Sequence, residues 1–280
     1  MQKHILMCKP TYFDVRYKLS TNSWMNPDNK PDIQLAQWQW NELYRACLEE
    51  VVLVDVVPPQ PNLLDMTFVA NAGLPHKDTF ILSNYFHPER RQESQHNAEF
   101  LRKMYGNRHL WFLAENALFE GEGDAVWLNE HQLIIAYGVR TNLEGVKAIA
   151  RILETYDPKI EVVPLPMRPN DKFYHLDTCL VYLSHAKTFL IYDYPFFPEA
   201  IEKLKHLGRV VTVDKEAAEK FICNSVVMNE KTIFMPWANE RTKDLLNSFG
   251  YTKIRTFDMS EFMKSGGAVK CLILEMQPPI

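Results

Sequence analysis

The feature that most constrains the fold is the alternation of short apolar runs with amphipathic segments along the whole chain. Most of the apolar runs are too short for helices and are typical of strands. About one amphipathic segment follows every two or three runs, whereas a doubly wound sheet pairs each strand with a helix. This order predicts an α/β or mixed α+β fold built from a repeated strand-rich unit, although the sequence itself shows no self-similarity.

The periodicity assigns both kinds of element by residue range. Strands are expected at Val51–Val56, Thr79–Leu82, Leu110–Leu113, Ala125–Leu128, Leu133–Tyr137, Ile160–Val163, Cys179–Leu183, Thr188–Tyr192, Val210–Val213, Thr232–Met235 and Cys271–Leu274. Helices are expected at Asp32–Glu50, Glu93–Tyr105, Leu143–Tyr156, Pro198–Leu207, Lys215–Phe221 and Arg241–Phe249. Asn142 and Asp214 stand at N-cap positions, where a side-chain oxygen accepts a hydrogen bond from the first turn.

Composition limits the domain organisation and the partners. A chain of 280 residues that is 46% hydrophobic can bury a large core, and no Gly/Ser-rich linker or charge block divides it, so one domain over residues 1–280 is expected. The formal net charge is −4 and no basic block occurs, which disfavours nucleic acid and anionic lipid as partners.

The cysteines and the N-terminal segment indicate in which cellular compartment the protein is expected. The five cysteines are scattered singly, without the paired spacing of a zinc site, and suit a reducing cytosol. No apolar run approaches the ~18 residues of a membrane span, and the N-terminal run is too short for a signal-peptide core. A cytoplasmic protein is expected.

Cys271 is a candidate nucleophile. It follows the glycine pair Gly266-Gly267 and Lys270, and a glycine-rich turn with a cation can supply the N–H donors and positive charge that favour a thiolate. The alternative is a buried core cysteine on the last strand.

Two further segments carry acid and base groups. Strand alternation in Phe173–Cys179 puts His175 and Asp177 on one face, which suits a proton-transfer histidine beside a carboxylate, although a core histidine fits equally well. The segment Phe119–Asp124 places Glu120, Glu122 and Asp124 among glycines, either as a source of a catalytic carboxylate or as a solvated acidic turn. It lacks the pattern of a dinucleotide-binding loop.

Three other polar residues interrupt the apolar pattern but are weaker indications of a functional site. Asn71 and Gly73 end an apolar run and can form a simple turn. Arg90 and Arg140 lie just before predicted helices, where an arginine serves solubility or grips a carboxylate through paired hydrogen bonds.

Taken together, the order and spacing of these segments resemble the guanidino-group-modifying superfamily, which includes arginine deiminases, dimethylarginine hydrolases and amidinotransferases. The resemblance runs from Met7–Pro10 to Gly266–Cys271, and in Phe68–Leu74, Pro88–Arg90, Phe119–Asp124 and Phe173–Cys179 it is closest to the catalytic portion of arginine dihydrolases. It implies a five-bladed α/β propeller of repeated ββαβ units with the active site in the central channel.

The resemblance also implies catalytic roles. Cys271 is the nucleophile, His175 the general acid/base, Asp177 a ligand of the substrate guanidinium, and Glu120 the catalytic carboxylate. The chain has one residue more than the usual carboxylate-Gly-Gly-Asp pattern, so Glu122 stays open as the alternative to Glu120.

Substrate-binding roles follow in the same way. Arg140 is similar to an arginine that grips the substrate α-carboxylate, and Arg90 to one that orders the site. Asn71 replaces the guanidinium-binding aspartate of deiminases, as it does in dihydrolases. Asn22 lies in Asn-Ser-Trp-Met, where the family segment usually reads Asn-Pro-Trp-Met, so Ser23 is expected to alter the rigidity of this loop.

The function expected from this resemblance is cysteine-dependent hydrolysis of the guanidino group of arginine to ornithine, ammonia and carbon dioxide, through a covalent thiouronium. The partner is a small guanidino compound, and this chemistry requires no metal and no organic cofactor. An arginine deiminase, a dimethylarginine hydrolase, an amidinotransferase and a non-catalytic guanidine-binding protein stay open as alternatives. The sequence does not indicate an oligomeric state.

Overall fold

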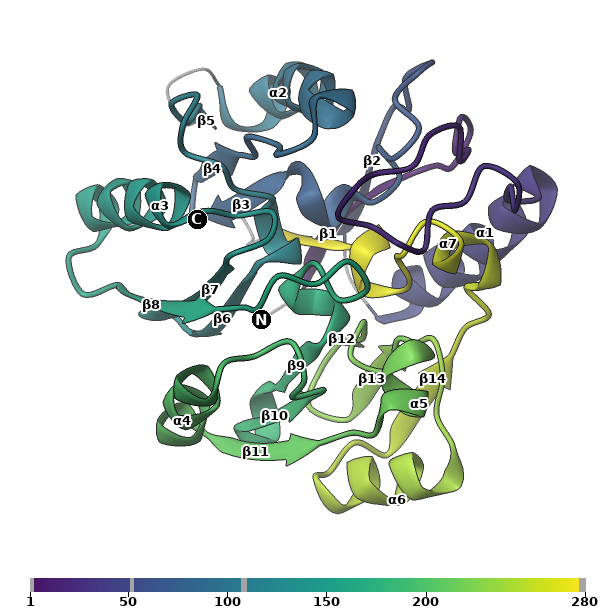
Figure 1. Cartoon of the computed structure of the whole chain (residues 1–280), viewed down its shortest axis with the longest axis vertical. Helices are drawn as coiled ribbons and strands as arrows, with labels where there is room; N and C mark the ends of the chain where they lie inside the picture. Colours follow the sequence, from purple (N-terminus) through teal and green to yellow (C-terminus); the bar gives the residue numbers. More distant parts are fainter. Residues whose placement is uncertain (1–2, 51–52, 107–109, 277–280) are drawn as a thin grey trace.

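Five three-stranded sheets surround a common centre (Figure 1) in the computed structural model, which describes residues 3–50, 53–106 and 110–276. We refer to these sheets as blades one to five. Their strands, in spatial order, are β15-β1-β2 (Leu274–Met276, His4–Cys8, Leu53–Val57), β3-β4-β5 (Gly73–His76, Thr79–Leu82, Leu110–Trp111), β6-β7-β8 (Ala125–Asn129, Gln132–Tyr137, Glu161–Pro166), β9-β10-β11 (Leu180–Leu183, Thr188–Ile191, Arg209–Thr212) and β12-β13-β14 (Val226–Val227, Thr232–Met235, Lys253–Thr256).

All five blades share one topology. The central strand pairs antiparallel with one neighbour and parallel with the other, and a helix connects the two parallel strands. The connecting helices are α1 (Ile33–Glu50), α2 (Arg91–Tyr105), α3 (Leu143–Tyr156), α4 (Pro198–Leu207) and α6 (Glu240–Ser248). Two shorter helices lie between blades: α5 (Lys215–Glu219) connects β11 to β12, and α7 (Ser260–Met263) lies between β14 and β15. The expected repeated ββαβ unit is confirmed.

The chain ends close the ring of blades. β15, near the C-terminus, pairs antiparallel with β1, near the N-terminus, and so supplies the first strand of blade one. Residues from the two ends of the chain therefore complete one sheet, which carries the segment containing Cys271 back to the centre of the molecule (Figure 1).

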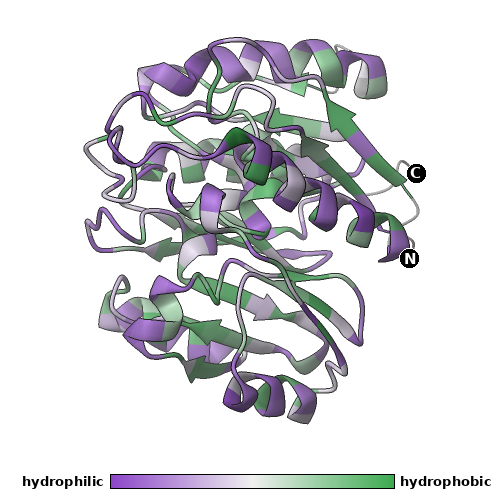
Figure 2. Ribbon diagram, turned by 90° about the vertical axis from the view of Figure 1, so that its right-hand side faces the viewer, coloured by the Kyte–Doolittle hydropathy of each residue, from purple (hydrophilic) through white to green (hydrophobic). Residues whose placement is uncertain are grey.

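The central strands are buried on both faces because each one packs against the blades on either side. In β7, Ile134 and Ala136 contribute to the core shared with blade four, whereas Leu133 and Ile135 contribute to the core shared with blade two. Because side chains alternate between the two faces of a strand, each central strand contributes residues to two cores, which explains why these strands are continuous apolar runs. The strands are accordingly hydrophobic, and polar residues collect on the outer helices (Figure 2).

Five turns bring polar residues to the centre. A 3₁₀ turn precedes the first strand in blades two, three, four and one, at Val69–Ala72, Gly121–Gly123, Leu176–Thr178 and Lys270–Leu272, and the loop before β12 occupies the same place in blade five. Each turn places a polar residue or a cysteine two or three positions before its strand: Asn71, Glu122, Asp177, Asn224 and Cys271.

Several sequence predictions need correction. Cys271 does not begin a strand, because it lies in the turn before β15, and His175 and Asp177 lie in and beside a 3₁₀ turn instead of alternating along a strand. The prediction missed β1, β3, β12, β14 and α7. Residues 51–52 of the predicted strand Val51–Val56 lie outside the described residues. The N-caps Asn142 and Asp214 are confirmed, since their side chains accept from Gly145 N and Ala217 N.

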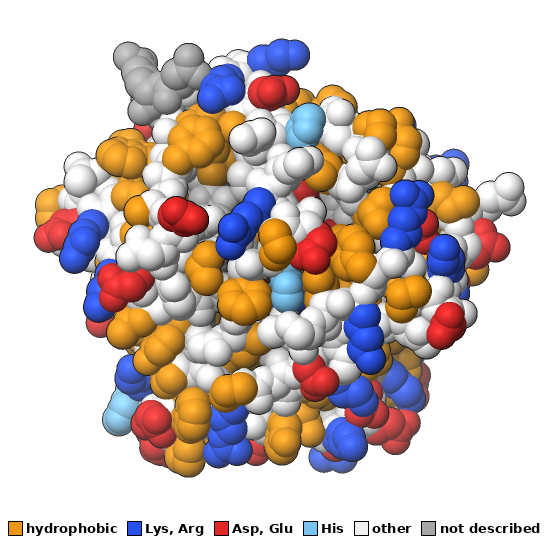
Figure 3. Space-filling view, turned by 45° about the horizontal axis from the view of Figure 1, so that its top comes forward, with side chains coloured by type: hydrophobic (Ala, Val, Ile, Leu, Met, Phe, Trp, Pro, Cys, Tyr) orange, Lys and Arg blue, Asp and Glu red, His pale blue; other side chains and the backbone are white. Residues whose placement is uncertain are grey.

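Acidic and basic side chains are interspersed on the face drawn in Figure 3 and do not form a broad patch of one sign. No helix of the described residues is long and apolar enough to cross a membrane.

Candidate active site

A small pocket of about 20 Å³ lies at the centre, between the polar turns and the loop of residues 19–25. Six of the residues that the sequence assigned to the site line this pocket: Asn22, Asn71, Arg90, Arg140, His175 and Cys271. The other two, Glu120 and Asp177, adjoin it through hydrogen bonds to His175 and Cys271. The fold therefore brings all eight together from seven separate segments of the chain.

Cys271 is buried and its thiol donates to Asp177 Oδ2 over 3.1 Å. Burial and the neighbouring Asp177 carboxylate raise the pKa of this thiol well above its ordinary value, while hydrogen bonds from the Ala268 backbone and from Asn224 oppose the shift. Without a cationic ligand, Cys271 is thus held as a neutral thiol.

Lys270 does not act on the thiol as the sequence suggested. Its ammonium donates to Glu122 Oε2 over 2.6 Å and to the Ile273 carbonyl over 3.0 Å. The same Glu122 oxygen accepts from the Glu275 backbone N–H. The positive charge of Lys270 is therefore compensated by Glu122, and both side chains belong to an ion pair near the centre instead of to the catalytic pocket.

His175 is paired with Glu120. His175 Nε2 lies 2.8 Å from Glu120 Oε2, and both residues are buried. Glu120 also accepts from Phe86 N through Oε1 and from Arg140 Nη1 through Oε2. Burial alone raises the pKa of Glu120, but Arg140 and His175 together hold it below its ordinary value. The carboxylate is thus ionised, and it fixes the histidine ring with Nε2 turned toward it.

Asp177 lies at the other side of the thiol. Burial raises its pKa to about 6, although the hydrogen bond from Cys271 and the charge of Lys270 act in the opposite direction. Its Oδ1 atom is buried and has no hydrogen-bond partner among the described residues. A cationic donor placed here would satisfy this oxygen and stabilise the charged form.

Arg90 orients Asn71. Its guanidinium forms paired hydrogen bonds of 2.9 Å with the Glu93 carboxylate, and its Nη1 donates to Asn71 Oδ1 over 3.0 Å. Because a guanidinium only donates, the Asn71 oxygen faces Arg90, and its Nδ2 donates to the Glu120 carbonyl.

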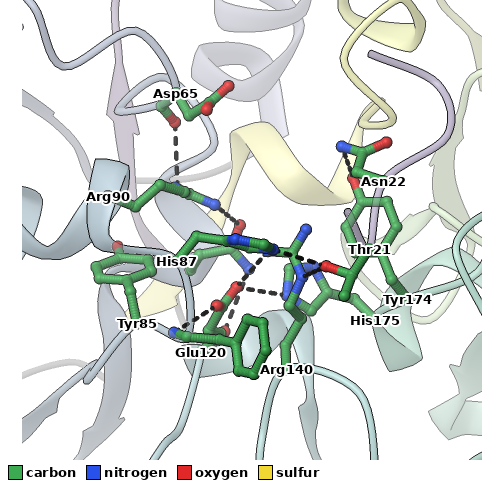
Figure 4. A network of polar contacts seen from close by, with 12 residues as sticks. Thr21, Asn22, Asp65, Tyr85, His87, Arg90, Glu120, Arg140, Tyr174 and His175 are labelled. Atoms are coloured by element: carbon green, nitrogen blue, oxygen red, sulfur yellow. Dashed lines mark hydrogen bonds and ion pairs between the residues drawn. The ribbon is translucent and has the colours of Figure 1, made fainter. Parts of the chain in front are cut away.

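Arg140 spans the pocket wall next to the loop that covers it (Figure 4). Besides its bond to Glu120, it donates from Nε to Thr21 Oγ1 over 2.6 Å and lies 4.6 Å above the Tyr174 ring. Its Nη2 atom is buried, and in the part of the chain that the structure describes it has no hydrogen-bond partner. A guanidinium held on one side with a free N–H group on the other is suited to an anionic ligand.

Asn22 holds the covering loop in place. Its Nδ2 donates to Tyr174 Oη and to the Ser265 carbonyl, and its Oδ1 accepts from Trp24 N. The backbone N–H of Ser23 donates to the Asp171 carbonyl over 2.8 Å, a bond that the proline of the family segment cannot make. The Ser23 departure thus adds an anchor to this loop.

Glycines allow the close approach of these groups. A Cβ atom at Gly123 would lie 2.2 Å from Asn71 Nδ2 and 3.3 Å from His175 Nδ1. Gly266 has φ +78°, and its Cβ would lie 2.5 Å from Tyr174 Oη. The glycines in the acidic segment and before Cys271 are therefore steric requirements of the site.

Sequence analysis missed two buried residues here. Asp65 lines the pocket, and its carboxylate accepts from Tyr17 Oη and Ser265 Oγ. Asn224 donates to Cys271 Sγ over 3.1 Å. The sequence carried no signal for Asn224, because the two-residue strand β12 that follows it shows no periodicity; only the structure shows that its place before β12 matches the place of Cys271 before β15.

Comparisons with known proteins agree with this geometry. The family model for eukaryotic N,N dimethylarginine dimethylhydrolase matches residues 9–277. The bifunctional arginine dihydrolase/ornithine cyclodeaminase ArgZ of a Synechocystis species is 34% identical over 99% of this chain, which spans only 38% of the length of ArgZ. The N(G),N(G)-dimethylarginine dimethylaminohydrolase of Mycobacterium tuberculosis is 31% identical, with 97% of this chain and 85% of that protein covered.

A solved structure extends the similarity to three dimensions. The crystal structure of the N-terminal domain of ArgZ bound to its product has a TM-score of 0.90 and 32% identity, and the match covers 100% of this chain and 99% of that domain. Since the family model and the two relatives match nearly the whole of this chain and agree with the five-blade fold, the chain belongs to the N,N-dimethylarginine dimethylhydrolase family of guanidino-group-modifying enzymes.

Proposed function

We propose that this protein hydrolyses the guanidino group of arginine to ornithine, ammonia and carbon dioxide. The observation that carries the proposal is that a Cys271 thiol paired with Asp177 and a histidine held by an ionised glutamate meet at one small central pocket. ArgZ, which is named an arginine dihydrolase, supports the same function.

Two of the buried polar atoms that have no partner among the described residues match the two ends of the substrate. Asp177 Oδ1 is an acceptor beside the nucleophile, and Arg140 Nη2 is a donor at the pocket wall. Arginine carries a cationic guanidinium at one end and an α-carboxylate at the other, so one molecule can satisfy both atoms. Asp65, a further carboxylate on the pocket wall, suits the α-ammonium group.

The chemistry begins when the bound guanidinium favours the thiolate of Cys271. The sulfur attacks the guanidino carbon, His175 gives a proton to the departing nitrogen, and ammonia leaves a planar thiouronium. His175 then takes a proton from water, which attacks the carbon, and the C–S bond breaks with its electron pair returning to sulfur. Glu120 orients His175 through the contact between Oε2 and Nε2.

If the ureido product is released after this first hydrolysis, the product is citrulline, whereas a product that stays bound can undergo a second hydrolysis. The thiolate attacks the ureido carbon, a second ammonia leaves, and hydrolysis gives a carbamate that collapses to ornithine and carbon dioxide. Asn71 assists the second round because a neutral amide held by Arg90 donates to a ureido oxygen that an aspartate would repel.

Hydrolysis of dimethylarginine is the second candidate. It is favoured by the name of the matching family model and by the M. tuberculosis relative. It differs from the first in requiring space for N-methyl groups and in releasing methylated amines. A transfer to an amine acceptor and a non-catalytic guanidine-binding role rest on no specific contact of the described residues.

The decisive experiment is an amino-acid analysis of purified protein incubated with L-arginine, beside a Cys271→Ala control. Ornithine with about two ammonia per turnover supports the proposal, and an Asn71→Asp variant should then release citrulline. Citrulline as the sole product of the unaltered protein assigns a deiminase. Activity confined to methylated arginines would assign dimethylarginine hydrolysis. If neither the unaltered protein nor Cys271→Ala turns over any guanidine, the result contradicts an enzymatic role.

We also expect a cytoplasmic location, because all five cysteines are buried and unpaired, as in a reducing compartment. Fractionation of the producing cells tests this expectation.

A further inference from the structure

Asn224 is a buried asparagine that touches the sulfur of Cys271. It lies in the loop before β12 with 0% of its surface exposed. Its Nδ2 is 3.1 Å from Cys271 Sγ and 3.2 Å from the Asp177 carbonyl oxygen. This contact opposes the raised pKa of the thiol, but no catalytic step described above uses it.

The backbone of the Cys271 turn fixes the orientation of the amide. Asn224 Oδ1 accepts from the N–H groups of Lys270 at 2.9 Å, Ala268 at 3.1 Å and Cys271 at 3.3 Å. Backbone N–H groups can only donate, so the oxygen must face them, and the opposite orientation would leave three donors against an NH₂ group. The NH₂ group is therefore directed at the sulfur.

The charges around the sulfur show why such a donor matters. Asp177, on the facing turn, opposes ionisation of the thiol, and Glu122 compensates the nearby Lys270 ammonium. Asn224 is the side-chain hydrogen-bond donor to Sγ among the described residues. An amide donor stabilises a sulfur anion without bringing a second cation that would compete with a guanidinium for Asp177.

We propose that Asn224 is a catalytic residue that stabilises the Cys271 thiolate by hydrogen bonding and presents the sulfur to the substrate carbon. This inference rests on the proposed role of Cys271 as nucleophile. The sulfur carries negative charge before it attacks and again when the C–S bond breaks and the electron pair returns to it, so the same donor acts in both steps.

The test compares Asn224→Ala, which removes the donor, with Asn224→Asp, which keeps the accepting oxygen but replaces the donor by an acceptor. Ionisation of Cys271 is followed by the ultraviolet absorbance of the thiolate and by the rate of alkylation with iodoacetamide, after subtraction of a Cys271→Ala background. Titration above neutral pH keeps Asp177, with its pKa of about 6, ionised throughout.

Loss of the donor should raise the apparent pKa of the thiol by about one unit or more in both variants, and should lower the alkylation rate at fixed pH about tenfold. With the substrate, kcat should fall with little change in KM. Asn239→Ala is the matched control: this side chain also accepts from a backbone N–H, at the start of α6, and does not line the pocket. It should lower stability without changing the titration.

The thiol readout requires no turnover, so it separates failure of this inference from failure of the proposed substrate. Folded Asn224 variants with an unchanged thiol titration and unchanged kcat would overturn the inference. Should neither variant fold, nuclear magnetic resonance of the otherwise unaltered protein decides the question. The Asn224 side-chain amide signal should shift as the thiol titrates and should lose that shift in Cys271→Ala, and a signal insensitive to the titration contradicts the proposal.

Discussion

Replacing Asp177 by asparagine should inactivate the protein and also stabilise it. The Asp177 carboxylate is buried, it raises the pKa of the Cys271 thiol, and one of its oxygens has no partner. In the absence of a cationic ligand, the folded state therefore carries the cost of a buried charge. An asparagine side chain is nearly isosteric with aspartate and neutral, so Asp177→Asn removes the cost together with the ligand of the guanidinium.

The magnitude follows from the shift of the Asp177 pKa from 3.8 to about 6 on folding. Because the folded pKa is the higher one, the folded state binds more protons between these values, and stability is lost as the pH rises through this window. A shift of about two units corresponds to up to about 3 kcal/mol. The variant should gain this free energy of unfolding above about pH 6, where the charge has formed, and little below about pH 4.

Urea unfolding of both proteins at a series of pH values measures the gain, and alkylation of Cys271 by iodoacetamide measures the thiol. The thiol should become more acidic and react faster in Asp177→Asn, while kcat/KM for the substrate falls at least about 100-fold with the loss of charge-assisted hydrogen bonds. Asp124→Asn is the control for the thiol, since Asp124 is also buried with a pKa of about 6 but bonds Thr141 and Leu176 N instead of Cys271. A less stable or less reactive Asp177→Asn protein above about pH 6 would refute the reasoning.

Two further predictions concern the acidic segment before β6. Glu120→Gln should lower kcat by about 100-fold or more because His175 loses its charged partner, whereas Glu122→Gln should retain most activity. Glu120→Gln should also lower the free energy of unfolding by about 3 kcal/mol, since it removes the carboxylate paired with the buried Arg140 guanidinium. Glu122→Gln should lower the free energy of unfolding by less, since Lys270 keeps Glu275 as an ion-pair partner at 3.9 Å. Steady-state kinetics and urea unfolding of the two proteins check this, and the opposite order of activities would assign the catalytic carboxylate to Glu122. Gly123→Ala should lower kcat more than it lowers thermal stability, because the added methyl group meets Asn71 Nδ2 at 2.2 Å and His175 at 3.3 Å. Measurements of kcat and of thermal unfolding test this. A fully active variant would show that these two side chains can move aside without loss of function.

The repeated strand-rich unit was predictable because it is a local property of the chain. Each central strand packs on two neighbouring blades, which demands a continuous apolar run, and each connecting helix needs one apolar face. The short strand β12 was missed because two residues carry no periodicity, and β3 because a proline and glycine lie within it. The strand assigned to Cys271 was wrong because a 3₁₀ turn and a strand start have the same apolar composition.

The sequence by itself determined which residue types form the site: a cysteine, a histidine, carboxylates and arginines set between apolar runs at spacings that resemble one enzyme superfamily. The tertiary structure decided their partners. It pairs Glu120 with His175 and Glu122 with Lys270, although the two glutamates are separated by one glycine, and it places Asn224 against Cys271 across 47 positions of sequence. These outcomes depend on how five turns converge at the centre of the ring, and burial there changes the free energy of each charge by an amount that local sequence does not encode.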